Sequence, residues 1–241
     1  STARYNIKVE FEDKDQSELI LPLIQKLNAD HITVQEDFVE DKLVVTLKEA
    51  VSCLETGSRM TIDSNILDAV GVYRQQEDIV LEMYCKDAYG YELRLEENRL
   101  VVSFVPIRSQ YQILSVIYVP LKDRERFINQ DMQELDKIAK TYGMKVYKTW
   151  QLQTEYSQQQ VIDFANHIHA DMLLGIGVEE GAGQDRIETL CNAGYFIPEF
   201  GGVELAAVMT DSMNRVYSAS QIQVADAEEE CTLIHDASIP A

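Results

Sequence analysis

The stretch Ile113-Leu114-Ser115-Val116-Ile117-Tyr118-Val119-Pro120 decides how the second half of this 241-residue chain is interpreted. It is a continuous apolar run that ends at a proline, which is typical of a strand buried on both faces of a sheet. Around it, amphipathic helices are predicted within 127–142, from residue 161 and over 203–216, and further strands at 144–147, 171–177 and 231–234. Strands that alternate with helices predict an α/β domain with a mostly parallel sheet covered by helices.

The residues before this stretch follow a different pattern, in which short segments alternate apolar and polar side chains. They predict strands at 5–11, 32–34, 42–47, 59–62, 79–83, 91–95 and 99–105. The spacing of the leucines between Glu18 and Leu27 predicts one helix among them. Many short strands joined by polar turns favour a small N-terminal β-sandwich, and we place the two domains at 1–108 and 109–241.

Charge and composition exclude several classes of protein. With 41 acidic and 21 basic residues, the formal net charge is -20, which opposes sequence-independent binding to nucleic acid and to anionic membranes. No apolar run approaches the roughly 20 residues of a membrane-spanning helix. The four cysteines form no Cys-x-x-Cys pair; Cys53 and Cys85 could form a disulfide, or all four could be isolated buried thiols.

Taken in order, several segments of the second half resemble the zinc-dependent N-acetylmuramoyl-L-alanine amidases. These enzymes cleave the bond between muramic acid and the stem peptide of peptidoglycan. The resemblance rests on residues 114–120, 127–142, 143–146, 163–166, 170–176 and 233–241, together with Leu205-Ala206. The strands at 42–47 and 79–83 and the hairpin at 91–105 make the first half similar to the β-sandwich domain called AMIN, which often precedes such amidases. Together the resemblances imply an extracytoplasmic protein of the cell envelope, and a signal or anchor before Ser1 could have been removed.

The resemblance also implies where a zinc site would lie. The positions of the two ligand histidines hold Lys122 and Gly177, and Glu179 holds that of an asparagine. Glu125 is near the position of the glutamate ligand, and Arg124 is equally close to it. An ammonium group repels a cation and glycine offers no ligand, so we expect no tight zinc site and no cofactor. Trp150 and Glu180 could line a cleft, although a core or rim aromatic and a solvated acidic loop are the competing interpretations.

Three hypotheses about function follow. The first is a degenerate amidase, a pseudoenzyme that binds peptidoglycan or a cell-envelope protein without catalysis. The second is an active N-acetylmuramoyl-L-alanine amidase that holds zinc with altered ligands, of which Glu125, Glu179 and His167 are the first candidates. The third is a generic α/β protein that binds a small ligand through the glycine-rich loop at 175–183.

Overall fold

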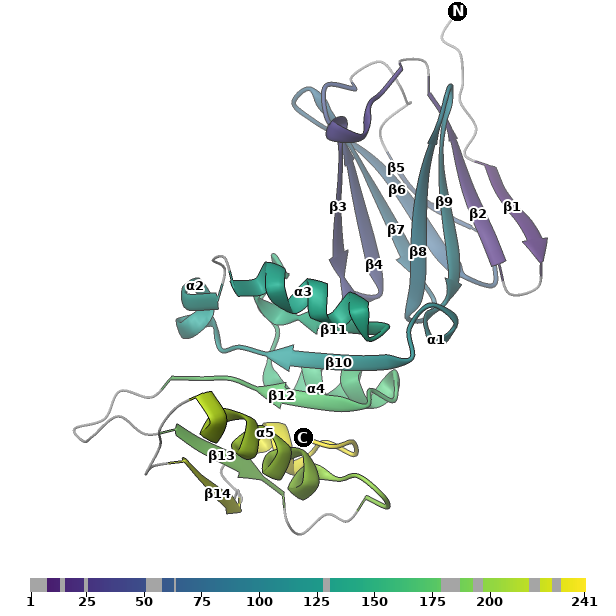
Figure 1. Ribbon diagram of the computed structural model, residues 1–241. Coiled ribbons are helices and arrows are strands. Elements are labelled where there is room, and N and C mark those ends of the chain that lie inside the picture. The colour runs from purple at the N-terminus through teal and green to yellow at the C-terminus, as the bar shows by residue number, and fades with distance from the viewer. Residues whose placement is uncertain are drawn as a thin grey trace, which may run out of the picture. The chain divides into compact units, whose positions relative to one another are not determined.

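The computed structural model describes residues 8–13, 16–23, 26–50, 58–62, 64–127, 131–178, 187–192, 197–216, 222–226 and 231–241. The chain forms two compact units, Ser1–Gln110 and Tyr111–Ala241, called here the first and the second unit. Each is considered by itself (Figure 1).

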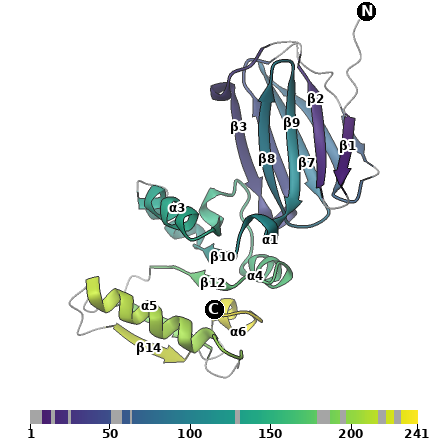
Figure 2. The ribbon, with the colours of Figure 1, turned by 45° about the vertical axis from the view of Figure 1, so that its right-hand side comes forward.

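The first unit consists of two antiparallel sheets that lie face to face (Figures 1 and 2). One sheet has the order β1 (Lys8–Asp13), β2 (Gln16–Pro22), β9 (Arg99–Pro106), β8 (Tyr89–Glu96). The other has the order β3 (Ile32–Asp37), β4 (Lys42–Leu47), β7 (Asp78–Cys85), β6 (Leu67–Gln75), β5 (Ser58–Thr61). The short helices η1 (Ala29–His31), η2 (Phe38–Glu40) and α1 (Ile107–Gln110) complete the described elements of this unit.

The core of the first unit follows from the alternation of its strands. Every second residue of β4 is buried, and these side chains are in register with the buried residues of β7. The inward side chains of β2 and β9 are matched in the same way. Both sheets therefore contribute to one core, which includes Leu19, Leu21, Leu43, Val45, Leu47, Ile79, Leu81, Met83, Leu100, Val102 and Phe104.

The helix expected between Glu18 and Leu27 is wrong, because strand β2 covers Gln16–Pro22. Leu19 and Leu21 both point into the core and pair with Val102 and Leu100 of β9. The leucines of this segment fit a period of two as well as helical spacing, and pairing with a buried strand decides between them.

The second unit contains a three-stranded parallel sheet with β10 (Ile113–Tyr118) between β11 (Met144–Lys148) and β12 (Met172–Gly175). Alternate residues of these strands contact different helices. Ile117 and Val146 pack with Ala139 of α3 (Asp131–Thr141), whereas Tyr147 contacts Phe164 of α4 (Gln158–His167) with ring centroids 5.0 Å apart. The sheet is thus covered on both faces.

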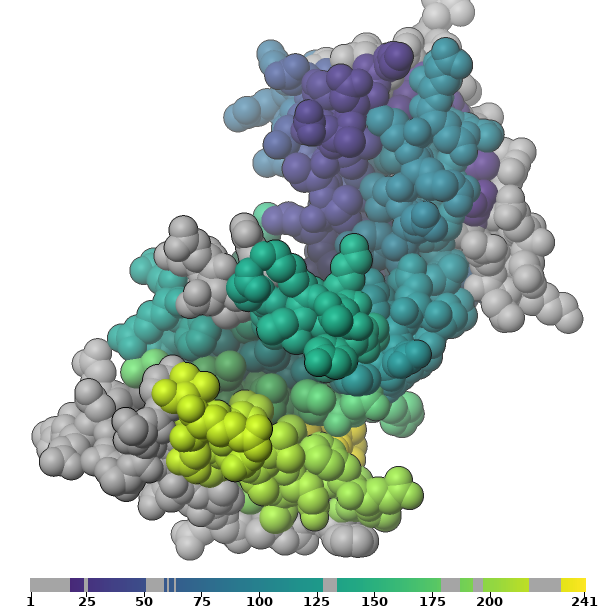
Figure 3. Space-filling model, viewed as in Figure 1, coloured from purple at the N-terminus to yellow at the C-terminus, as the bar shows by residue number. Residues whose placement is uncertain are grey.

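Two further strands of the second unit form a separate sheet. β13 (Ile187–Cys191) and β14 (Ile222–Asp226) pair in parallel, and α5 (Gly202–Val216) packs against both. α5 lies at the surface of the unit (Figure 3). β13 and β14 do not extend the three-stranded sheet. The edge of β12 that faces away from β10 contacts the C-terminal segment, where Leu173 N donates a hydrogen bond to Pro240 O (2.9 Å).

These observations correct the expected fold class. The described sheets are mostly antiparallel, and the parallel part is one small sheet and a strand pair rather than a mostly parallel sheet covered by helices. The strand expected at 231–234 is also wrong, since Thr232–His235 forms the short helix α6. Because Pro240 meets the edge of β12 and α6 packs on α4, this segment closes the small sheet without adding a strand.

Candidate functional site

The candidate site is the carboxyl edge of the three-stranded sheet, where ligands bind in parallel α/β sheets. Three segments meet there: 119–127 after β10, 149–157 after β11 and 176–178 after β12. The first includes η3 (Leu121–Asp123) and α2 (Arg124–Phe127), and the second includes η4 (Thr149–Gln151). Of the predicted site residues, Lys122, Glu125, Trp150 and Gly177 lie on these segments.

Asp123 joins the segment after β10 to the segment after β12. Its side chain is buried, and its Oδ2 atom accepts a hydrogen bond from Val178 N (3.0 Å). The same oxygen lies 3.7 Å from the position that a Cβ atom on Gly177 would take. The carboxylate that follows Lys122 therefore lies beside Gly177 and holds the two loops together. Sequence reasoning missed this residue, and its signal was an acidic side chain in the short segment that follows the proline at the end of a strand.

Arg124 and Thr149 join the segments after β10 and β11. Arg124 donates from Nε to Trp150 O (2.9 Å) and from Nη2 to Thr149 O (3.3 Å). Between the same two segments, Val119 N donates a hydrogen bond to Thr149 Oγ1 (2.9 Å). Carbonyl oxygens at the end of a strand need such donors, so these side chains satisfy the backbone of both loops. All three segments of the edge are thus linked by side-chain hydrogen bonds.

The predicted site residues are not gathered around one point. Lys122 and Glu125 are exposed on η3 and α2. Trp150 is only 5% exposed and packs with Ile117 and Val119, and its ring centroid lies 6.2 Å from that of Phe127. Most of the indole ring is therefore part of the core rather than the wall of a cleft. Glu179 and Glu180 lie outside the described residues, as does Cys53, and Cys85, its partner in the disulfide alternative, is a free thiol.

Cys85 and Lys148 are ionisable groups that are largely shielded from solvent. Burial raises the pKa of the Cys85 thiol to about 12, so this thiol stays protonated at neutral pH. Lys148 at the end of β11 is buried and forms an ion pair with Asp136 of α3. An unpaired buried ammonium would be costly, so the pair ties α3 to the sheet near the candidate site.

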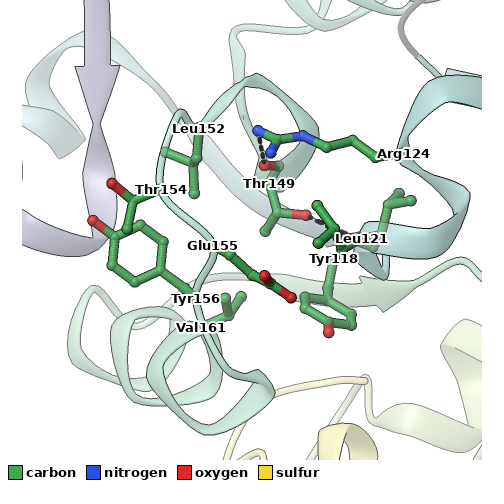
Figure 4. A pocket seen from close by; sticks show the side chains of 10 residues that line it. Tyr118, Leu121, Arg124, Thr149, Leu152, Thr154, Glu155, Tyr156 and Val161 are labelled. Atoms are coloured by element: carbon green, nitrogen blue, oxygen red, sulfur yellow. Dashed lines mark hydrogen bonds between the residues drawn. The ribbon is translucent and has the colours of Figure 1, made fainter.

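A shallow pocket opens at this edge, between β10 and the start of α4 (Figure 4). Its cavity volume is only about 30 Å³, and it is partly open to solvent. Leu152, Tyr156 and Val161 form a buried apolar wall, and Arg124 and Glu155 supply opposite charges. The Glu155 side chain lies between Tyr118 and Tyr156 in Figure 4. The pocket therefore combines an apolar surface with one guanidinium and one carboxylate.

The first turn of α4 fixes the segment that carries Glu155. Ser157 caps the helix, since its Oγ accepts a hydrogen bond from Gln160 N (3.3 Å) and Gln160 Oε1 accepts one from Ser157 N (3.0 Å). Tyr118 lines the pocket opposite this turn. Burial raises the pKa of its phenol, with a smaller contribution from Glu155 and an opposing one from the hydrogen bond with Gln158. Tyr118 is therefore a neutral hydroxyl at physiological pH.

In the described part of the chain, no three side chains of His, Cys, Asp or Glu converge where they could bind a metal ion together. No helix within the same residues is long and apolar enough to cross a membrane. Comparison of the sequence with known proteins finds no protein-family model and no curated protein that matches it. The resemblances to amidases and to AMIN domains thus stay predictions.

Proposed function

We propose that this chain is a non-catalytic protein of the cell envelope whose second unit binds peptidoglycan. The proposal rests on which residues occupy the carboxyl edge of the three-stranded sheet. The two places where a zinc-dependent amidase would have histidines hold Lys122 and Gly177. Between them, the Asp123 carboxylate binds backbone of the neighbouring loop.

The chemistry of these groups favours binding over hydrolysis. A zinc-dependent amide hydrolase needs three protein ligands, an open position for water and a general base. Gly177 has no side chain, and the Lys122 ammonium is a cation that must lose its proton before it can coordinate metal. Arg124 and Thr149 use their polar atoms to hold the loops of this edge. The edge is thus built as a fixed surface.

Peptidoglycan fits this surface better than a polyanionic envelope polymer does. The net charge of -20 opposes binding to a polyphosphate chain, whereas the stem peptides of peptidoglycan carry both amino and carboxyl groups. A guanidinium and a carboxylate, those of Arg124 and Glu155, lie at this edge, and such mixed charges suit a peptide that carries both amino and carboxyl groups.

Sedimentation with purified peptidoglycan tests the proposal. The full chain should sediment with insoluble peptidoglycan, and soluble muropeptides added in excess should release it. With and without added zinc, no muropeptide should be cleaved from the insoluble material. Stoichiometric zinc together with amidase cleavage would show that the protein is an enzyme, and failure to sediment would show that peptidoglycan is not its ligand.

A further inference from the structure

Residues 236–241, which follow α6, connect α4 with the outer edge of β12 without forming a helix or a strand. They are called the strap here. At α4 the strap is held by Asn166, and at β12 Pro240 O accepts a hydrogen bond from Leu173 N (2.9 Å). Figure 2 shows the yellow C-terminal part of the chain beside α4, and α6 and α4 are in contact.

The attachment of the strap to α4 depends on one side chain. Asn166 lies in the last turn of α4, where its Oδ1 atom accepts hydrogen bonds from Ser238 N and Ser238 Oγ (both 2.9 Å). Its Nδ2 atom donates to Asp236 O (3.4 Å). Both polar atoms of one side chain therefore bind the strap, and the strap itself adds the small buried residues Ala237 and Ile239.

The strap lies on an edge of the sheet. β10 pairs with β12 on one side, and β13 and β14 form a separate sheet. On an edge strand, the N–H and C=O groups of alternate residues point away from the sheet and can pair with another extended segment. Leu173 N points to the strap in this way, whereas Ile176 N donates to Tyr118 O on the side of β10 (2.9 Å).

The sequence of β12 gives this edge no protection of its own. Exposed edges of natural sheets usually carry charged residues or proline, which oppose pairing with another chain. β12 consists of Met172-Leu173-Leu174-Gly175 and has neither. Two copies of β12 could therefore lie side by side without like charges facing each other, although the whole chain carries a net charge of -20.

We propose that the strap guards the edge of β12, with Asn166 as its latch, and that release of the latch opens this edge to pairing with a second copy of the chain. A second copy is the partner because the same release bares the same edge in each chain. Two such edges can pair antiparallel about a twofold axis, which closes the contact at two copies. This inference is independent of the proposed function.

Amide hydrogen exchange of the full chain, followed by NMR, tests the latch. Asn166→Ala removes three hydrogen bonds to the strap, so exchange at Leu173 should become about 10- to 100-fold faster. Exchange at Ile176, whose N–H faces β10, should stay as in the parent. Unchanged exchange at Leu173, or equal acceleration at both amides, would overturn the latch, because the second result means that the whole sheet opens.

Two further variants show that the effect belongs to the strap rather than to α4. Ser238→Ala removes one of the three hydrogen bonds from an exposed residue and should accelerate exchange at Leu173 by about fivefold. Asp163→Ala removes an exposed acceptor on the same helix, which binds Gln159 and not the strap. It should leave exchange at Leu173 unchanged, and an acceleration as large as that in Asn166→Ala would contradict the assignment.

Sedimentation velocity tests the guard. At equal protein concentration, Asn166→Ala should form more dimer than the parent does. Adding Met172→Lys places two like charges at the paired edges, so the double variant should return to the sedimentation of the parent. Faster exchange at Leu173 without added dimer would overturn the guard, and dimer that persists in the double variant would place the contact elsewhere and overturn it as well.

Discussion

Arg94 on β8 and Glu18 on β2 form an ion pair that crosses β9, the strand between them. Ser103 of β9 donates a second hydrogen bond to the same carboxylate oxygen (2.9 Å). Burial alone would raise the pKa of Glu18, but the hydrogen bonds from Arg94 and Ser103 and the positive charge of Arg94 outweigh it and lower this pKa. Three strands are thereby connected through one buried carboxylate.

Glu18→Gln should therefore destabilise the first unit by about 1–3 kcal/mol at neutral pH, the usual cost of losing a charged hydrogen bond. Because the pKa of Glu18 is lower in the folded state, its stabilisation is present above the unfolded-state pKa and is lost as pH falls through the folded-state pKa. The difference in the free energy of unfolding between parent and variant should thus become smaller in acid. Urea unfolding followed by circular dichroism at several pH values measures it, and Glu97→Gln is the control. A difference that stays constant from neutral pH into acid would contradict this account.

Gly175 at the end of β12 should tolerate a side chain only if the buried Leu233 side chain shifts. A Cβ atom on Gly175 would lie 2.4 Å from Leu233 Cδ2, so Gly175→Ala should destabilise the second unit by about 1–3 kcal/mol. Leu233→Ala leaves a cavity of its own but removes the clash. The double variant should then be more stable than the sum of the single effects predicts, and strict additivity would show that the two residues do not compete for space.

Gly177 offers the matched control at the same edge. Its Cβ position lies 3.7 Å from both Asp123 Oδ2 and Pro120 Cγ, which is ordinary van der Waals contact. Gly177→Ala should change the free energy of unfolding by no more than about 0.5 kcal/mol. A larger loss would mean that the backbone at Gly177 needs glycine for another reason.

Asp123→Ala should weaken the link between the loops after β10 and β12. The variant loses the acceptor for Val178 N, and we expect a loss of about 1–3 kcal/mol in stability. Amide hydrogen exchange at Val178 should become faster. Glu125→Ala, an exposed change two residues away, should leave both quantities near those of the parent. Unchanged exchange at Val178 in Asp123→Ala would argue against the link.

Trp150 should act as a reporter of the second unit alone, since it is the single tryptophan of the chain. Its ring is 5% exposed, so emission should be blue-shifted and poorly quenched by acrylamide until the second unit unfolds. Trp150→Ala should cost about 3–5 kcal/mol, as for other buried aromatics. Trp150→Phe, which keeps an aromatic ring beside Phe127, should cost less. Strong quenching in the native protein would place the ring in a cleft instead.

Much of the local structure could be predicted because side-chain periodicity reports burial directly. The expected strand at 42–47 has the bounds of β4, and the helix ending before Gly143 does so because this glycine adopts a positive φ of 61°. β6, the strand Leu67–Gln75, was missed because Ala69, Val70, Gly71 and Val72 are all buried and hide the alternation. β13 was missed because Glu188 and its acidic neighbours in sequence suggested a loop.

Sheet membership was harder to predict, because it depends on contacts distant in the sequence. No local pattern shows that β13 pairs with β14 rather than with β12, or that Pro240 meets the edge of β12. In the same way, the sequence pointed to Lys122 and Gly177, but not to Asp123 between them. The role of Asp123 depends on Val178, 55 residues away, which only the folded chain brings near.

The pairing of β2 with β9 sets the order in which the first unit can be made. Ser103 and Glu18 are separated by 85 residues. The sheet cannot be completed until β9, which lies far along the chain, pairs with β2. Such distant partners slow folding, because the loop between them must be closed before any contact is gained. During synthesis on the ribosome, the leucines of β2 therefore stay without their final partners until β9, which ends at Pro106, has left the exit tunnel.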